Sequence, residues 1–441
     1  MSEKTFYDVP SVQGPINCVV EVPGSKSITN RALLIAALCD REVQLSNVLF
    51  SDDSRHFMDC LSKLGFNVKW DENSKTVMVK GNHGLIPNQK ATINVGSAGT
   101  AARFLTAFLS TSPGEYLIEA SPQMAARPMK PLLDALRSLG AQFEFLGKPD
   151  CLPFRVKGAG SPDGVVTLEA NISSQFLSAL LIVGCLGKSG LEINISGELA
   201  AQPYIEMTLR MMGVFGVQVE TEDFRKFKVS PQGYIGQNYT IEPDVSNACY
   251  FWAMAVLTGG SALVKDIPLD SLQGDLQFLK VLKQLGARID VKKSGIYIEG
   301  PAGGEFPGVE VDLSATPDQS MTLAALAPYA SSPTAIRNIG LIKYHESNRI
   351  AAIINELGRM GIQAEELDDG ILIHPGTPHP AAIETYDDHR MAMAFALTGL
   401  KTAGIRIKNP ACTRKTFENY FEIFDRIVQE NIILKSGDRI R

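Results

Sequence analysis

The sequence has few of the residues that build metal or disulfide sites. Its seven cysteines are odd in number, widely scattered and nowhere spaced as CxxC, and its six histidines stand apart. These spacings support neither a disulfide framework nor a zinc site. We therefore expect no metal site and a reducing, cytoplasmic location.

The sequence also lacks a long apolar run and an excess of positive charge. The segment MSEKTFYDVP has no apolar core of a signal peptide, and the stretch FLSALLIVGCLG is too short to cross a bilayer. The formal net charge is −6, which disfavours a general binder of nucleic acid or of an anionic membrane. A small anionic ligand is compatible with this charge, because a few focused cations suffice to bind it.

What the sequence does contain is a long repeat. A predicted helix that ends in Leu-Gly or a similar pair, followed by alternating strand residues, recurs five times at intervals of 70 to 76 residues. The marker glycines are Gly65, Gly140, Gly216, Gly286 and Gly361. Glycine is favoured just after a helix, where the backbone turns left-handed. The 441 residues accommodate about six such units, which predicts two domains of three units each.

The stretch PGSKSITNR, residues 23–31, combines glycine, lysine and serine just before an apolar run. It lacks the frame of a Walker A loop, in which glycine directly precedes the lysine. We predict a helix that begins near Asn30 and is capped by Ser27 or Thr29, with Lys26 and Arg31 beside its start. An anion site at this helix start and an ordinary capped surface helix both fit the local pattern.

Small or polar residues precede apolar helices at several later points. In GSAGTAARFLTAFL, Gly99 allows close approach of a ligand and Arg103 lies in the first turn. Arg127 directly precedes Pro128, which we predict to be the first residue of a helix. The stretch NISSQFLSALLI places three neutral hydrogen-bonding side chains at a helix start: Ser173, Ser174 and Gln175. Each of these patterns alone also fits a plain helix cap.

The second half of the chain places acids and cations in the same way. Asp318 precedes an apolar helix, and the three-residue spacing of Glu346 and Arg349 predicts one helical face. The remaining charged residues at predicted helix starts are Asp387, Asp388, His389, Arg390, Arg414 and Lys415. If these starts converge on one cleft, they form a site for a multiply charged anion. Asp318 and Glu346 would then supply the acid and the base.

The motifs, taken in order, resemble those of the 5-enolpyruvylshikimate-3-phosphate synthase (3-phosphoshikimate 1-carboxyvinyltransferase) family of enolpyruvyl transferases. The resemblance covers essentially the whole chain and rests on PGSKSITNRALLIAAL, GTAARFLTA, RPMKPLLDALRSLGA, SSQFLSALL, PDQSMTLA, ESNRI, TYDDHRMAMAFAL and CTRKTFENYF. It implies an α/β fold of two inside-out barrels, each of three βαβαββ units with helices inside and sheets outside. We expect residues 1–22 with 243–441 to form one domain, residues 23–242 to form the other, and the active site to lie in the cleft between them.

The resemblance implies transfer of the enolpyruvyl group of phosphoenolpyruvate to the 5-hydroxyl of shikimate 3-phosphate, with release of phosphate and without cofactor, in aromatic amino acid biosynthesis. It implies a monomer that glyphosate inhibits in competition with phosphoenolpyruvate. The implied catalytic residues are Asp318, Glu346 and Lys26. The implied shikimate 3-phosphate ligands are Lys26, Ser27, Arg31, Ser173, Ser174, Gln175, Tyr204, Asp318 and His345. The implied phosphoenolpyruvate ligands are Lys26, Gly99, Arg127, Gln175, Arg349, Arg390 and Lys415.

Three residues depart from the family pattern. Ser97 replaces the usual asparagine, Ala201 a frequent serine and His345 a common lysine. Because an imidazole loses its charge near neutrality, we expect shikimate 3-phosphate binding to weaken between about pH 6 and 8. Two alternatives remain open: a related transferase with another acceptor, and a non-catalytic binder of phosphate or RNA ends that shares the repeat.

Overall fold

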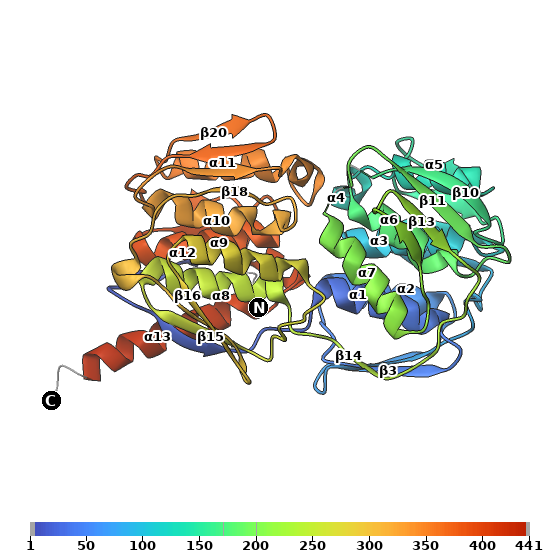
Figure 1. Ribbon diagram of the computed structural model, residues 1–441, viewed down its shortest axis with the longest axis horizontal. Helices are drawn as coiled ribbons and strands as arrows, with labels where there is room; N and C mark the ends of the chain where they lie inside the picture. Colours follow the sequence, from blue (N-terminus) through green and yellow to red (C-terminus); the bar gives the residue numbers. More distant parts are fainter. Residues whose placement is uncertain (1–4, 171, 200, 438–441) are drawn as a thin grey trace. The chain divides into compact units, whose positions relative to one another are not determined.

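The chain divides into two compact units (Figure 1). The computed structural model describes residues 5–170, 172–199 and 201–437. Unit 1 comprises Met1–Pro23 and Pro243–Arg441, and unit 2 comprises Gly24–Glu242. The chain therefore passes from one unit to the other twice, at residues 23/24 and at residues 242/243.

Within the described residues, unit 2 contains three four-stranded sheets of one common pattern. In spatial order they are β14 (Tyr239–Thr240), β3 (Glu42–Ser46), β5 (Thr76–Lys80), β4 (Val68–Asp71); β6 (Lys90–Asn94), β7 (Glu115–Glu119), β9 (Phe154–Lys157), β8 (Gln142–Phe145); and β10 (Gly164–Glu169), β11 (Leu191–Ser196), β13 (Lys226–Val229), β12 (Glu220–Glu222). In each sheet the first two strands are parallel and the other pairs are antiparallel.

Unit 1 repeats this pattern in two sheets and shortens it in a third, counted over the described residues. In spatial order, starting from the parallel pair, they are β2 (Asn17–Val20), β15 (Ser261–Lys265), β17 (Gly295–Glu299), β16 (Arg288–Lys292); β18 (Glu310–Asp312), β19 (Thr334–Arg337), β21 (Gly370–Ile373), β20 (Ala364–Leu367); and β22 (Ala382–Ile383), β23 (Arg406–Lys408), β1 (Phe6–Asp8). Strand β2 pairs with β15, more than 240 residues later, in parallel register.

The two crossings of the chain explain how the repeats are completed. Strand β14 lies near the end of unit 2 but fills the first-strand position of the sheet that begins with β3. Strand β2 precedes the first crossing and fills the same position in the sheet of β15. Each full repeat then reads strand, helix, strand, helix and hairpin, whichever part of the chain supplies its first strand.

The helices of unit 2 pack among themselves beneath these sheets. They are α1 (Lys26–Leu38), α2 (Asp52–Lys63), α3 (Gly99–Ser110), α4 (Pro122–Ala125), α5 (Lys130–Ser138), α6 (Ser174–Gly184) and α7 (Gln202–Val214). Helix α3 contacts both α1 and α6, and every residue of α3 is buried. The apolar run of α3 is therefore explained by burial on all sides of this helix.

In unit 1, α8 (Val245–Thr258), α10 (Ser320–Leu326) and α12 (His389–Lys401) pack against one another (Figure 1). The other helices are α9 (Phe278–Gln284), α11 (Arg349–Arg359) and α13 (Tyr420–Gly437), with 3₁₀ turns η1 (Gly274–Gln277), η2 (Ala302–Gly304), η3 (Pro317–Gln319), η4 (Ala327–Tyr329), η5 (Gly340–Tyr344) and η6 (Pro410–Lys415). Every residue of α8 is buried.

All five marker glycines adopt the left-handed backbone that the repeat predicted. Their φ angles lie between +78° and +98°, and each follows directly after a helix and its cap residue. Most residues are strained at such angles, whereas glycine is not. Each glycine therefore ends a helix and sends the chain back into the sheet.

Candidate active site

Helix α1 begins one turn earlier than we predicted. Its first residue is Lys26, and the hydroxyl of Ser25 accepts a hydrogen bond from an amide of the first turn. The prediction of a start near Asn30 with Ser27 or Thr29 as the cap is wrong. The reason is that Ser25 already has an extended backbone and a capping hydroxyl, so the helix closes on the first suitable residue.

This earlier start places Lys26 and Ser27 in the first turn of α1. The Lys26 ammonium lies 3.6 Å from Asp53, whose side chain is buried. The partial positive charge of a helix N-terminus attracts anions, and a neighbouring lysine adds a full charge. Lys26 and Ser27 thus occupy a position suited to a phosphorylated ligand.

Arg31, one turn further along α1, is buried and extensively hydrogen-bonded inside unit 2. Its guanidinium donates to Thr208 Oγ1 (2.8 Å), Ser27 O (3.0 Å), Ser178 Oγ (3.2 Å) and Tyr204 O (3.2 Å). It also lies over the Phe104 ring, 5.5 Å from the centroid. Burial lowers the pKa of Arg31 to about 10, so the side chain stays cationic at neutral pH. Arg31 therefore ties α1 to α6 and α7.

Gly99 brings two arginines to the start of α3. It is the first residue of that helix, and the preceding Ala98 provides no side-chain cap. A Cβ at Gly99 would lie 2.4 Å from Arg103 Nη1 and 2.7 Å from Arg127 Nη1. Both arginines are almost fully buried. Two guanidinium groups and an uncapped helix start thus meet where only glycine leaves room.

Arg127 does not lie at the mouth of a helix that starts at Pro128, as we predicted. Helix α5 begins at Lys130, and Pro131 is within its first two positions. A start at Pro128 would put Pro131 at the fourth position, where its missing N–H would remove the first intrahelical hydrogen bond. Arg127 instead lies in the link between α4 and α5, directed toward Gly99.

The three polar residues at the start of α6 lie where the sequence predicted them. Ser173 is the cap residue and accepts a hydrogen bond from the Gln175 amide (3.3 Å). Gln175 Oε1 is buried and has no hydrogen-bond partner among the described residues. A buried amide oxygen without a partner is costly unless a ligand or water supplies one.

Tyr204 lies in the first turn of α7, and its carbonyl oxygen accepts hydrogen bonds from Arg31 and Thr208. Ala201, the residue before α7, is left-handed, with φ +49°, and provides no side-chain cap. A serine here could cap the helix or contact a phosphate. The departure at Ala201 therefore removes a hydroxyl from this helix start.

In unit 1, a single buried arginine joins three carboxylates. Arg349 Nε lies 2.8 Å from Asp388, Nη1 lies 2.7 Å from Asp318 and Nη2 lies 2.9 Å from Glu346. Its side chain is only 1% exposed. Such a buried cation is stable only because each edge of its guanidinium fork meets an acceptor.

The pairing of Glu346 with Arg349 is present, but not on one helical face as we predicted. Helix α11 begins at Arg349, with Asn348 as its cap, so Glu346 precedes the helix. The capping side chain of Asn348 stops the helix from extending backward. Glu346 reaches Arg349 from the link that follows η5.

Two further cations complete what we call the acid–base cluster, defined by Asp318, His345, Glu346, Arg349, Asp388, Arg390 and Lys415. Arg390 Nη2 lies 2.8 Å from Asp318, and Lys415 Nζ lies 3.7 Å from Glu346. Arg390 lies in the first turn of α12 and Lys415 at the end of η6. Three cations thus face three carboxylates in this cluster.

Asp318 is held as a carboxylate by its neighbours. Burial favours the neutral acid, but Arg390 and Arg349 outweigh it and hold the pKa of Asp318 well below its usual range. In this state Asp318 is fully ionised and a weak base. Anything that draws either arginine away will raise the pKa of Asp318.

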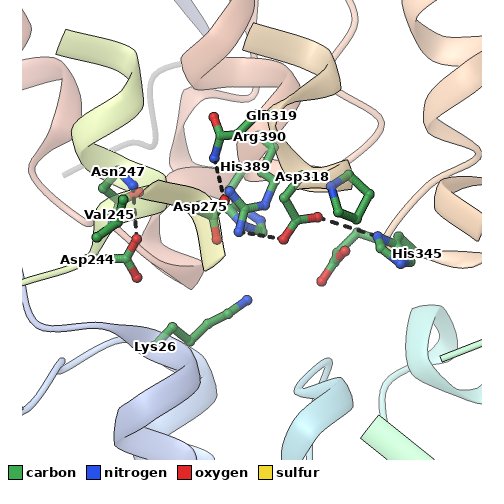
Figure 2. Close-up of polar contacts among 12 residues, drawn as sticks. Lys26, Asp244, Val245, Asn247, Asp275, Asp318, Gln319, His345, His389 and Arg390 are labelled. Atoms are coloured by element: carbon green, nitrogen blue, oxygen red, sulfur yellow. Dashed lines mark hydrogen bonds and ion pairs between the residues drawn. The ribbon is translucent and has the colours of Figure 1, made fainter. Parts of the chain in front are cut away.

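His345 lies at the edge of the cluster in its neutral form. Arg349 Nη1 lies 3.0 Å from His345 Nδ1, and because arginine can only donate, Nδ1 must accept. The 3.5 Å approach of the same Nδ1 to Asp318 is then no ion pair. Burial is the largest effect on His345 and, with Arg349, lowers the pKa of the ring below 6.5. Figure 2 shows His345 and Arg390 approaching Asp318 from different sides.

Three further residues contact or lie close to the proposed ligands but were not among the catalytic or binding residues that the sequence predicted. Asp388 caps α12 and binds Arg349, Arg103 meets Gly99, and the buried Asp275 accepts from Gln319 Nε2 (2.8 Å). The motif DDHR and the first-turn position of Arg103 were visible signals for two of them. Nothing local distinguishes Asp275, because its hydrogen-bond donor Gln319 is 44 residues away in the sequence.

In the part of the chain that the structure describes, no group of three or more His, Cys, Asp or Glu side chains could hold a metal ion. Among the same residues, no helix combines the length and apolarity needed to cross a bilayer.

Comparisons with known proteins agree with the motifs. The family model of EPSP synthase (3-phosphoshikimate 1-carboxyvinyltransferase) matches residues 11–424. A 3-phosphoshikimate 1-carboxyvinyltransferase of Trichormus variabilis is 44% identical over 421 residues, 95% of this chain and 98% of that protein. One from Vibrio cholerae is 40% identical over 432 residues, 97% of this chain and 100% of that protein.

A solved structure supports the architecture. An EPSP synthase from Acinetobacter baumannii superposes with a TM-score of 0.79 and covers 96% of this chain and 98% of its own. Its sequence is 23% identical, so this likeness bears on the fold alone, a mixed α/β fold.

Proposed function

The chain belongs to the EPSP synthase (3-phosphoshikimate 1-carboxyvinyltransferase) family, and we propose that its two sets of helix-start residues form one active site. The reaction is transfer of the enolpyruvyl group of phosphoenolpyruvate to the 5-hydroxyl of shikimate 3-phosphate, with release of phosphate. The proposed site lies in a cleft between residues 1–22 with 243–441 and residues 23–242. The acid–base cluster carries the proposal most directly, because it places three cations beside two carboxylates suited to proton transfer.

The charges of phosphoenolpyruvate account for the cations. Its carboxylate and phosphate need several donors, and planar arginine binds both groups with paired hydrogen bonds. The proposed ligands are Lys26, Gly99, Arg127, Gln175, Arg349, Arg390 and Lys415. The close approach of Arg127 to Gly99 supports a shared role of these two residues in binding phosphoenolpyruvate.

Asp318 is the proposed base for the 5-hydroxyl. Arg390 and Arg349 hold its pKa well below the usual range. When phosphoenolpyruvate takes part of their hydrogen-bonding capacity, the carboxylate loses stabilisation and its pKa rises. Binding of one substrate thereby makes Asp318 a better base for the other.

Glu346 is the proposed acid that protonates the methylene carbon of phosphoenolpyruvate. Protonation leaves positive charge on the adjacent carbon, which the 5-oxygen attacks to form a tetrahedral ketal. Loss of a methyl proton and of phosphate from the ketal then regenerates the vinyl group. Lys415, 3.7 Å from Glu346, and Lys26 are the proposed cations that stabilise the anionic groups in these steps.

The shikimate 3-phosphate ligands of the proposal are Lys26, Ser27, Arg31, Ser173, Ser174, Gln175, Tyr204, Asp318 and His345. The unsatisfied buried oxygen of Gln175 and the capped start of α6 support the serine–glutamine group. Arg31 already serves neighbouring helices, so its role toward substrate includes holding these helices in place.

The finer architecture and setting are part of the same proposal. We propose that each unit is an inside-out barrel of three βαβαββ repeats, which the common sheet order and the buried α3 and α8 support. We also propose a cytoplasmic monomer without cofactor. The free state of all seven cysteines fits a reducing compartment.

The test is release of inorganic phosphate by the purified chain. We expect phosphate only when phosphoenolpyruvate and shikimate 3-phosphate are both present. A UDP-sugar replaces shikimate 3-phosphate in the second arm, because Ala201 and His345 leave another acceptor open. If phosphoenolpyruvate releases phosphate with the UDP-sugar but not with shikimate 3-phosphate, the chain uses a different acceptor. If it releases phosphate with neither acceptor, transferase activity is refuted.

A further inference from the structure

Asp275 is a buried carboxylate that the proposed mechanism does not use. It lies in η1, is 3% exposed and accepts a hydrogen bond from Gln319 Nε2 (2.8 Å). Gln319 follows the proposed base Asp318 directly and is itself fully buried. Its amide oxygen accepts from Thr322 Oγ1 (3.0 Å). Asp275 thus fixes the short turn that carries Asp318.

Asp275 also lies within the electrostatic reach of Arg390. The guanidinium of Arg390 favours the charged form of Asp275 as it does that of Asp318. Figure 2 shows Asp275 and Asp318 beside the Arg390 side chain, with Gln319 bonded to Asp275. Arg390 therefore interacts electrostatically with two carboxylates, and of these only Asp318 takes part in the proposed reaction.

We propose that Asp275 is a positioning residue, which aligns Arg390 with phosphoenolpyruvate and holds the Gln319 turn behind Asp318. This inference rests on the proposed function and deepens it. When an incoming anion competes with Asp318 for Arg390, the second carboxylate keeps the guanidinium aligned.

The charge of Asp275 makes this role separable from simple packing. Burial raises its pKa to about 6, Arg390 opposes this, and Asp318 and Asp244 add to it. The Cys249 thiol also couples to Asp275, and burial raises the pKa of this thiol far above neutrality. Asp275 accordingly changes charge near pH 6, and its alignment of Arg390 operates above that pH.

The experiment compares wild type with Asp275→Asn, which keeps an oxygen for Gln319 but has no charge. Phosphate release gives kcat and the KM for phosphoenolpyruvate between about pH 5 and 8.5 at saturating shikimate 3-phosphate, and calorimetry gives the affinity for phosphoenolpyruvate over the same range. We expect the variant's KM to be about 3- to 10-fold higher above pH 7, and the ratio of the two KM values to approach one below pH 6. Titration of the substrates and of His345 is common to both proteins and cancels in the ratio.

Asp290→Asn, the same change at an exposed position of β16, is the matched control. Its KM for phosphoenolpyruvate should equal that of wild type at every pH. A ratio that is constant with pH, or that never exceeds one, overturns the positioning role. Calorimetry can show this pH-dependent ratio between the dissociation constants of variant and wild type for phosphoenolpyruvate even if wild type releases no phosphate. In that case the proposed reaction fails and the role of Asp275 stands. If wild type neither binds phosphoenolpyruvate nor releases phosphate, both fail.

Discussion

Arg349 Nε and Asp388 Oδ2 lie 2.8 Å apart, with side chains 1% and 0% exposed. Asp388 also caps α12 through the Arg390 amide. One carboxylate therefore orients two arginines of the proposed phosphoenolpyruvate pocket, one through its guanidinium and one through its backbone.

Removing this carboxylate should destabilise the fold. Asp388→Ala leaves Arg349 with one fewer partner and α12 without a cap, and we expect the free energy of unfolding to fall by about 3 to 5 kcal/mol. Urea denaturation followed by circular dichroism measures the change. Asp368→Ala, at an exposed turn, is the control and should change it by less than about 0.5 kcal/mol. Equal stability of the two variants would show that the buried pair contributes little.

Arg31→Lys tests the view that Arg31 ties helices together. Lysine cannot reproduce four hydrogen bonds from a planar fork, so we expect a loss of about 2 to 4 kcal/mol in the free energy of unfolding. The KM for shikimate 3-phosphate should rise as well, because α6 and α7 carry other proposed ligands. An unchanged unfolding free energy with a raised KM would instead mark Arg31 as a ligand alone.

Gly99→Ala should disturb phosphoenolpyruvate and glyphosate together. The new Cβ would approach Arg103 Nη1 and Arg127 Nη1 within 2.4 and 2.7 Å, so both guanidinium groups must shift. We expect the KM for phosphoenolpyruvate and the inhibition constant for glyphosate each to rise about 10-fold or more, as a displacement of about 1 Å in a substrate-positioning group suggests. Gly233→Ala, with nothing within 4 Å of its Cβ, is the control. Unchanged glyphosate inhibition in Gly99→Ala would contradict this placement of the pocket.

His345 should make shikimate 3-phosphate binding depend on pH. Burial lowers the pKa of the free ring below 6.5, and a bound phosphate would raise it. Affinity should then fall as pH rises from the lower to the higher of these values, by at most about one decade per pH unit. The predicted weakening between pH 6 and 8 therefore requires proton uptake on binding.

His345→Lys keeps a positive charge at this position between pH 6 and 8. The affinity of this variant for shikimate 3-phosphate should therefore depend less on pH than that of wild type. The ratio of dissociation constants for wild type and variant, measured by calorimetry, removes the titration of the substrate phosphate. A ratio that does not change with pH would exclude His345 from phosphate binding.

The sequence predicted the repeating parts of the fold well, because each marker glycine marks a helix end at which the backbone must turn left-handed. It misplaced the starts of α1 and α5, because neighbouring residues such as Ser25 and Pro131 compete for the same cap and first-turn positions. It paired Glu346 with Arg349 for a reason that the structure does not support. The role of Asp275 was not predictable, since its partners Gln319 and Arg390 are distant in sequence and meet only in the folded core.

The central claim is that this chain transfers the enolpyruvyl group with Asp318 as the base. The most direct measurement is phosphate release from phosphoenolpyruvate and shikimate 3-phosphate by wild type and by Asp318→Asn, each first shown to be folded by circular dichroism. We predict release by wild type and a kcat that is about 100- to 10,000-fold lower in the variant. No release by folded wild type, or undiminished release by Asp318→Asn, would contradict the account.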